Sequence, residues 1–297
     1  MNKEIYQFYQ KMNCDDVLKK KFYPVWFFGN ERINKILTTL IDEKAPKKNI
    51  TKIFSVGGSG DFAFSVLSTI KEIKEIITCD IRPMAPPTID IKKALFLEFS
   101  LEEILKLFSS PGFNKEKIYR KILGKISRES KIILDNVLNN CKQGDFLKCI
   151  KKSGFWYKDS FWQIKDKNAY LLYLTDQEKY QQLKNNLEKI SIYYGDFNGN
   201  LKLFKSGYFD LIYVSNIFDS KNYCQNISLY IQTIKEKLAE GGYLFVVTQN
   251  SPKKIIKLLE EKFAFRIHLK ELRRFNIITS LLGHYSYSFL IFKNVMA

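Results

Sequence analysis

The residues with the clearest chemical meaning form the stretch VGGSGD at residues 56–61, between an apolar run and an amphipathic one. Glycines let a backbone approach a ligand closely, and a strand-to-helix turn presents amide groups to an anion. The Asp61 carboxylate is unfavourable beside a pyrophosphate and suits an ammonium group, so we expect a ligand with an amino acid part. The predicted ligand-binding residues of this turn are Gly57, Gly58, Ser59, Gly60 and Asp61.

Two alternatives stay open for this turn. Glycine-rich strand-to-helix turns also occur in α/β proteins that bind no ligand there. A dinucleotide site is the other alternative, because Gly58, Gly60 and Ala63 satisfy the permissive G-x-G-x-x-G/A pattern.

Acidic or amide residues also follow three later apolar runs, EIITC, KISIYYG and FDLIYV. Asp80 lies 20 residues after Gly60, the spacing expected for a carboxylate that binds ribose hydroxyls. In a doubly wound sheet, ligands bind at the carboxyl ends of the strands, which favours a shared nucleoside site over isolated helix caps or a polar loop. The predicted cofactor-binding residues outside the glycine turn are Asp80, Ile81, Asp196, Phe197, Ser215 and Asn216.

The elements that must position these residues follow an alternating pattern from residue 50 onward. Short apolar runs alternate with amphipathic stretches, which predicts an α/β fold with a doubly wound, seven-stranded, mostly parallel sheet. Residues 1–48 are predicted as a helical cap, and residues 49–297 as the ligand-binding domain with a helical insertion at about 109–187. The runs at 265–275 and 284–293 predict a closing antiparallel pair, and the preceding helix is expected to end at the glycine pair Gly241 and Gly242.

Composition narrows the class of partner. The net charge of +17 comes mostly from lysines spread along the chain, so a nucleic acid partner is an alternative that the sequence does not favour. Five scattered cysteines, no signal peptide and no apolar run near the roughly 20 residues that span a bilayer predict a cytoplasmic protein. Peripheral association with anionic lipid headgroups is left open. The sequence has no metal-ligand spacing, so no metal is expected.

Several phrases together resemble one family, the S-adenosylmethionine:diacylglycerol 3-amino-3-carboxypropyl transferases of betaine-lipid synthesis. The similar phrases are SGDFAFSVLS, the turn Asp80-Ile81-Arg82-Pro83, a lysine-bearing helix followed by FSLEEILKLF, QGDFLKCI, and SNIFD at 215–219. The resemblance covers about residues 50–220. It implies the class I S-adenosylmethionine-dependent transferase fold, S-adenosylmethionine as cofactor, and transfer of the 3-amino-3-carboxypropyl group to a lipid or small-molecule acceptor.

This chemistry needs alignment of one sulfonium carbon with the acceptor, and a general base when the acceptor is a hydroxyl. Asp219 and Tyr285 are the candidates for catalytic residues. A methyltransferase of the same fold, acting on a small molecule or RNA, is the alternative enzyme. A protein that keeps the cofactor pocket without turnover is the alternative outside enzymes.

Overall fold

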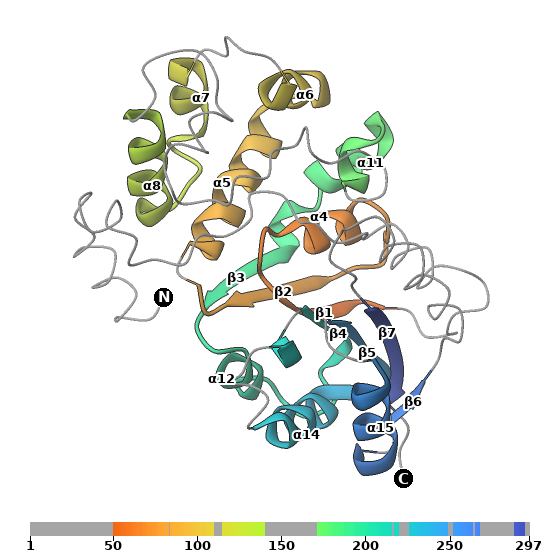
Figure 1. The fold of residues 1–297 in the computed structure, drawn as a ribbon. Coiled ribbons are helices and arrows are strands. Elements are labelled where there is room, and N and C mark those ends of the chain that lie inside the picture. Colours follow the sequence, from red (N-terminus) through yellow and green to blue (C-terminus); the bar gives the residue numbers. More distant parts are fainter. Residues whose placement is uncertain are drawn as a thin grey trace, which may run out of the picture. The chain divides into compact units, whose positions relative to one another are not determined.

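The computed structural model describes residues 50–82, 84–109, 115–139, 171–215, 217–219, 226–248, 252–263, 265–267 and 288–294. These residues belong to two compact units (Figure 1). The first unit contains residues 57–71 and the described parts of 78–195, and the second contains residues 50–56, 72–77 and the described parts of 196–294. The helical cap predicted for residues 1–48 lies outside the described residues.

Helices and strands alternate along most of the described chain, as the sequence pattern predicts. Their order and bounds are β1 (Lys52–Val56), α4 (Asp61–Leu67), β2 (Glu75–Asp80), α5 (Ala85–Glu98), α6 (Leu101–Ser109), α7 (Lys115–Ile122), α8 (Arg128–Asn139), η2 (Leu172–Leu174), α11 (Gln177–Lys184), η3 (Leu187–Lys189), β3 (Ile190–Tyr194), α12 (Phe197–Lys202), β4 (Phe209–Ser215), η4 (Ile217–Asp219), α14 (Ile227–Lys237), β5 (Leu238–Thr248), α15 (Pro252–Phe263), β6 (Phe265–Ile267) and β7 (Ser288–Asn294).

The strands are ordered β3-β2-β1-β4-β5-β7-β6. Strand β4 is parallel to both β1 and β5, whereas β7 runs antiparallel to β5 and to β6. The predictions of an α/β fold with a doubly wound, mostly parallel sheet and of a closing antiparallel pair are therefore confirmed.

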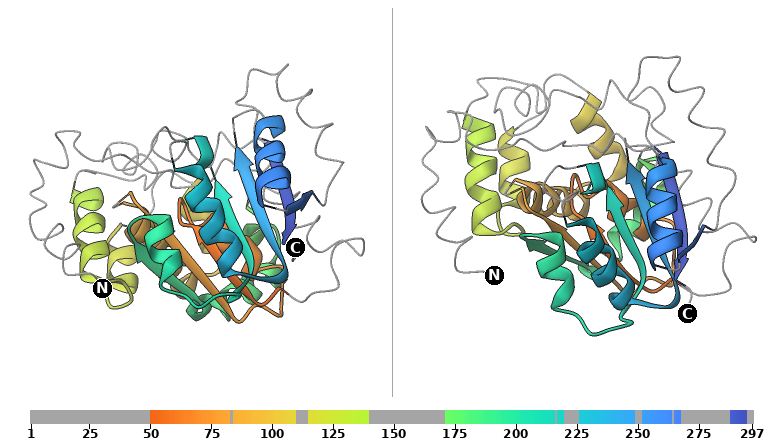
Figure 2. Two further views of the ribbon diagram at one scale, coloured as in Figure 1. Left: turned by 90° about the horizontal axis from the view of Figure 1, so that it is seen from below. Right: turned by 60° about the horizontal axis from the view of Figure 1, so that its bottom comes forward.

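The second unit is built around strands β1, β4 and β5. Helices α12, α14 and α15 lie in a row beside these strands (Figure 2). Phe54 of β1 is fully buried and meets the rings of Phe197, Phe204 and Phe209 edge-on, with centroids 5.0, 5.9 and 5.2 Å away. This aromatic cluster packs the start of α12 against β1.

The first unit is organised by α5, which packs against α6, α7, α8 and β3. Pro86 and Pro87 lie in the first turn of α5, where the missing amide protons cost nothing. The Phe96 ring of α5 packs against Phe64 of α4 and against Tyr173 and Tyr180 from the later helical region. Within the described part of residues 109–187, the α-helices are α7, α8 and α11.

The predicted end of the helix before β5 is wrong. Helix α14 ends at Lys237, and both Gly241 and Gly242 lie inside β5. A Cβ atom on Gly242 would lie 2.8 Å from the carbonyl oxygen of Ala239 and 3.0 Å from that of Asp210. The pairing of β4 with β5 also shifts register at this point. The glycine pair therefore lies at an irregularity near the start of β5, and it does not cap a helix.

Candidate functional site

The glycine-rich turn after β1 is compact and internally bonded. The amide of Gly57 donates to the carbonyl of Cys79 at 2.6 Å, and the amide of Gly60 donates to the carbonyl of Gly57 at 2.8 Å. Gly58 and Gly60 have φ angles of 49° and 79°, a region that side chains disfavour. A Cβ on Gly60 would also lie 2.9 Å from side-chain atoms of Ile89. Glycine at position 60 is thus required twice, by its backbone angle and by the packing of α5.

Asp80, at the carboxyl end of β2, is joined to this turn. Its Oδ2 accepts the Gly58 amide at 2.8 Å. Arg82 supplies three further donors: its amide and Nε reach Oδ1 at 2.8 and 3.1 Å, and its Nη2 reaches Oδ2 at 3.0 Å. A carboxylate offers about four acceptor positions, so these four donors occupy all the acceptor positions of the Asp80 side chain. Ribose hydroxyls can bind this carboxylate only when the Arg82 side chain withdraws.

The surroundings of Asp80 suit a nucleoside once Arg82 moves. The Asp80 side chain is 4% exposed, whereas the Arg82 side chain is 32% exposed and can turn into solvent. The neighbouring Ile81 is 56% exposed, so its apolar side chain can contact the face of a base. The amide of Gly195 donates to the Asp80 carbonyl at 3.0 Å, which brings the chain just before Asp196 to the same strand end.

Asp61 lies on the inner side of the turn, and its environment differs from the expected one. Its carboxylate is fully buried and accepts hydrogen bonds from the Ser59 hydroxyl at 2.9 Å and the Tyr173 hydroxyl at 2.5 Å. It also forms an ion pair with the ammonium of Lys92, which donates to the Ser59 carbonyl at 3.0 Å. The ammonium predicted to come from a ligand is therefore supplied by the protein. The charge argument against a pyrophosphate also weakens, because Lys92 neutralises Asp61.

The titration of this cluster reflects its burial. Burial lowers the pKa of the Lys92 ammonium, and the neighbouring Asp61 charge opposes that shift. Burial raises the pKa of the Tyr173 phenol well above its usual range, and the Asp61 carboxylate adds to the increase. Tyr173 therefore stays protonated and acts as a hydrogen-bond donor.

The predicted site residues of the second unit occupy structural positions. Asp196 caps α12, because its Oδ2 accepts the Gly199 amide at 2.7 Å, and the Tyr230 hydroxyl lies 3.4 Å from its Oδ1. The Phe197 side chain, expected beside adenine, is only 4% exposed and packs edge-on against Phe54 in the core. The cap that the sequence offered as an alternative for Asp196 is thus present.

The predicted cofactor-binding residues Ser215 and Asn216 and the two catalytic candidates are described only in part. Ser215 ends β4, paired in register with Val247 of β5. The backbone of Asp219 ends η4. Asn216 and Tyr285 lie outside the described residues, so the catalytic assignments to Asp219 and Tyr285 stay predictions.

Sequence reasoning missed three functional partners: Arg82, Lys92 and Tyr173. A signal for Lys92 is present, because it lies on the buried face of α5 at helical spacing from Ile89 and Phe96. A lysine on such a face needs a buried acceptor, and Asp61 is the acidic residue of the adjoining turn. No comparable signal exists for Tyr173, which is separated from Asp61 by 112 positions.

Among the residues that the structure describes, no group of three or more His, Cys, Asp or Glu side chains is placed to hold a metal ion. None of the described helices is both long and apolar enough to cross a membrane.

No protein-family model and no curated protein sequence matches this chain. Solved structures similar to it include the rRNA methyltransferase aviRa from Streptomyces viridochromogenes, with 7% identity and a TM-score of 0.45 over 96% of this chain and 94% of that one. A SAM-dependent methyltransferase from Methanosarcina mazei is 14% identical, with a TM-score of 0.39 over 84% and 95% of the two chains. Another from Aquifex aeolicus is 10% identical, with a TM-score of 0.37 over 96% and 100%. At TM-scores below 0.5, these likenesses carry no argument about what this chain binds.

Proposed function

We propose that this chain is an S-adenosylmethionine-dependent transferase. The observation that carries the proposal is the hydrogen bond from the Gly58 amide to Asp80, which joins a glycine turn to a strand-end carboxylate beside an exposed apolar side chain. Such a place can hold a nucleoside: the carboxylate takes the ribose hydroxyls, Ile81 covers the base, and the turn lets the backbone approach the rest of the ligand.

The sheet supports S-adenosylmethionine over a dinucleotide. Dinucleotide-binding sheets follow the order 3-2-1-4-5-6. In this chain β7 lies antiparallel between β5 and β6, so the strand order differs from the dinucleotide-binding one. Because folds host many functions, this topology supports the proposal only together with the Asp80 site.

For the group that is moved, we propose 3-amino-3-carboxypropyl. Two of the phrases that resemble the betaine-lipid transferases, SGDFAFSVLS and the lysine-bearing helix, supply the partners of one buried ion pair, Asp61 and Lys92. The two phrases thus have a common structural role, which supports treating them as parts of one resemblance to that family. Methyl transfer is the second candidate, because the same fold serves it.

In the proposed reaction, an acceptor nucleophile attacks the methylene carbon that joins the sulfonium to the amino acid part. A bond from the acceptor to that carbon forms, the carbon–sulfur bond breaks, and its electron pair stays on sulfur in methylthioadenosine. An acceptor hydroxyl loses its proton to a general base, for which Asp219 and Tyr285 remain the candidates. A lipid or a small polar molecule is the proposed acceptor.

The test is to incubate the protein with S-adenosylmethionine and an extract of lipids and polar metabolites, and to identify the nucleoside product by mass spectrometry. Methylthioadenosine above the no-enzyme background is the expected result. S-adenosylhomocysteine instead would establish methyl transfer and overturn the aminocarboxypropyl proposal.

A matched pair of variants ties the product to the site. Asp80→Ala should abolish product formation. Asp210→Ala serves as the control, because Asp210 also accepts backbone amides, those of Thr51 and Lys52, but at the opposite, amino-terminal end of β1. Equal activity of the two variants would remove Asp80 from the site.

A further inference from the structure

A single buried ammonium ties α5 to the glycine turn. Lys92 has no exposed side-chain surface, and its Nζ contacts both the Asp61 carboxylate and the Ser59 carbonyl. The same nitrogen lies 5.3 Å from the centre of the Phe64 ring on α4. Three parts of the first unit, the turn, α4 and α5, therefore meet at one charged group.

A contribution to stability does not by itself explain why a lysine is buried at this position. Burying a lysine and an aspartate has a large desolvation cost, and apolar side chains of similar size often replace such pairs at no loss of stability. An ammonium does what an apolar side chain cannot: it holds a carbonyl oxygen in one direction.

The carbonyl that Lys92 holds belongs to the peptide group between Ser59 and Gly60. The amide end of the same peptide group donates to the Gly57 carbonyl at 2.8 Å. Both ends of this peptide plane are thus fixed. Without Lys92 the plane keeps only the bond from its amide end, and it can turn more easily because Gly60, at one side of the plane, accepts a wide range of φ. The ammonium therefore selects one of several turn conformations.

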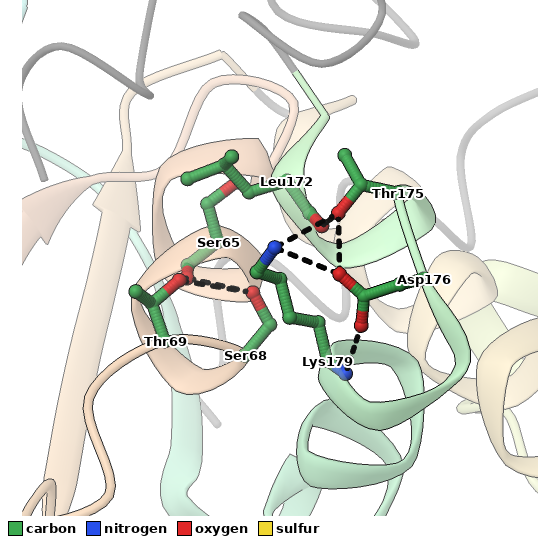
Figure 3. A network of polar contacts seen from close by, with 7 residues as sticks. All are labelled: Ser65, Ser68, Thr69, Leu172, Thr175, Asp176 and Lys179. Carbon is green, nitrogen blue, oxygen red and sulfur yellow. Dashed lines mark hydrogen bonds and ion pairs between the residues drawn. The ribbon is translucent and has the colours of Figure 1, made fainter. Parts of the chain in front are cut away.

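Tyr173, in η2, contacts the same cluster. Its hydroxyl donates to Asp61 at 2.5 Å, and its ring packs against Phe64 and Phe96. The segment after Tyr173 is held by a capping network in which Asp176 Oδ1 accepts the Lys179 amide at 2.8 Å (Figure 3). These contacts hold the Tyr173 hydroxyl against the Asp61 carboxylate, on the same oxygen that meets Lys92.

We propose that Lys92 is a positioning residue of the ligand site, which locks the Ser59–Gly60 peptide so that the glycine turn is formed before the ligand binds. The inference rests on the proposed function in that the ligand is S-adenosylmethionine. In this proposal the turn contacts the amino acid part of that ligand, and Asp80 binds its nucleoside. Loss of the Lys92 bond to the Ser59 carbonyl should therefore weaken binding of S-adenosylmethionine but not binding of adenosine.

The test uses the double variant Lys92→Met with Asp61→Asn, which removes both charges and leaves no unpaired ion. Calorimetry gives the Kd for S-adenosylmethionine and for adenosine, and thermal unfolding gives the Tm. We expect the Kd for S-adenosylmethionine to rise about tenfold, equivalent to about 1.4 kcal/mol, while the Kd for adenosine stays within about twofold.

Lys93→Met is the matched control. Lys93 is the next residue of α5 and donates to the Ile190 carbonyl at 2.8 Å, away from the turn, so both Kd values should match those of the wild type. Tyr173→Phe is a milder second variant that keeps both charges; a rise of about threefold, for S-adenosylmethionine alone, is expected from the loss of one hydrogen bond.

Each other outcome is decisive. Equal loss of affinity for both ligands, together with a lowered Tm, would make Lys92 merely structural and overturn the inference. So would unchanged S-adenosylmethionine affinity in the double variant, or in Tyr173→Phe if the double variant does not fold. Absence of S-adenosylmethionine binding by the wild type would instead overturn the proposed function.

Discussion

Two carboxylates flank the same glycine turn, and they have opposite surroundings. Asp61, on the inner side, is held by Lys92 and Tyr173, whose side chains are both buried. Asp80, on the outer side, is held by Arg82, whose side chain is 32% exposed. Both carboxylates are well supplied with donors, so hydrogen-bond number does not distinguish them.

The difference lies in whether the partner can leave. Moving Lys92 away from Asp61 would leave two buried charges without partners, at a cost of several kcal/mol. Moving the Arg82 side chain away from Asp80 places its guanidinium in water. The buried Asp80 carboxylate keeps its bonds from the amides of Gly58 and Arg82, and its freed acceptor positions can be taken by a ligand. We therefore interpret Asp80 as the carboxylate that meets the ligand and Asp61 as the one that shapes the turn.

The largest expected effect follows from breaking the inner pair. Asp61→Ala leaves the Lys92 ammonium buried without its counter-ion, so the free energy of unfolding should fall by about 3–5 kcal/mol. Urea denaturation measures this change. Asp80→Ala removes the acceptor of the Gly58 amide and of the partly exposed Arg82, so it should lower the same free energy by a smaller amount, about 1–2 kcal/mol. Equal losses would contradict the division between the two carboxylates.

The next effect compares the two glycines with positive φ. Gly60→Ala adds a Cβ 2.9 Å from Ile89 and forces a side chain into the left-handed region, so we expect a loss of about 2–4 kcal/mol. Gly58→Ala meets nothing closer than the Arg82 guanidinium at 4.0 Å, so only the backbone cost of about 1–2 kcal/mol remains. Thermal unfolding of both variants should show the larger drop in Tm for position 60.

Removing the charge of the outer carboxylate should act on binding rather than on folding. Asp80→Asn keeps the shape of the side chain but weakens its bonds to two ribose hydroxyls, so the Kd for S-adenosylmethionine should rise about 10- to 100-fold, or about 1.4–2.8 kcal/mol. Calorimetry at constant salt provides the measurement. An unchanged Kd would mean that Asp80 does not bind the ribose.

The smallest effect has the opposite sign. Arg82→Ala removes the group that competes with ribose for Asp80, so the Kd for S-adenosylmethionine should fall by about threefold, in line with the modest strength of an exposed ion pair. Raising the ionic strength should narrow the gap between variant and wild type, because salt screens the competing pair. Weaker binding by the variant would show that Arg82 supports the ligand instead.

Local features of the fold were predictable because they depend on neighbours in sequence. The run EIITCD forms β2 with the expected bounds, and the glycine stretch forms the expected turn. The end of α14 was not predictable, because Gly242 lies close to the backbone of β4 and Gly241 has a φ of 68°, and both lie inside β5 rather than at a helix end. A glycine pattern alone does not distinguish these two uses.

The sequence by itself determined the strand and helix periodicity, the glycine turn, and the acidic residues at the strand ends. Only the tertiary structure decided what Asp61 contacts. Lys92 and Tyr173 reach Asp61 across 31 and 112 positions, and Arg82 reaches Asp80 across two. Periodicity reports which side chains are buried, whereas the partner of a buried charge depends on how separate segments pack. That packing makes one carboxylate part of the scaffold and leaves the other within reach of a ligand.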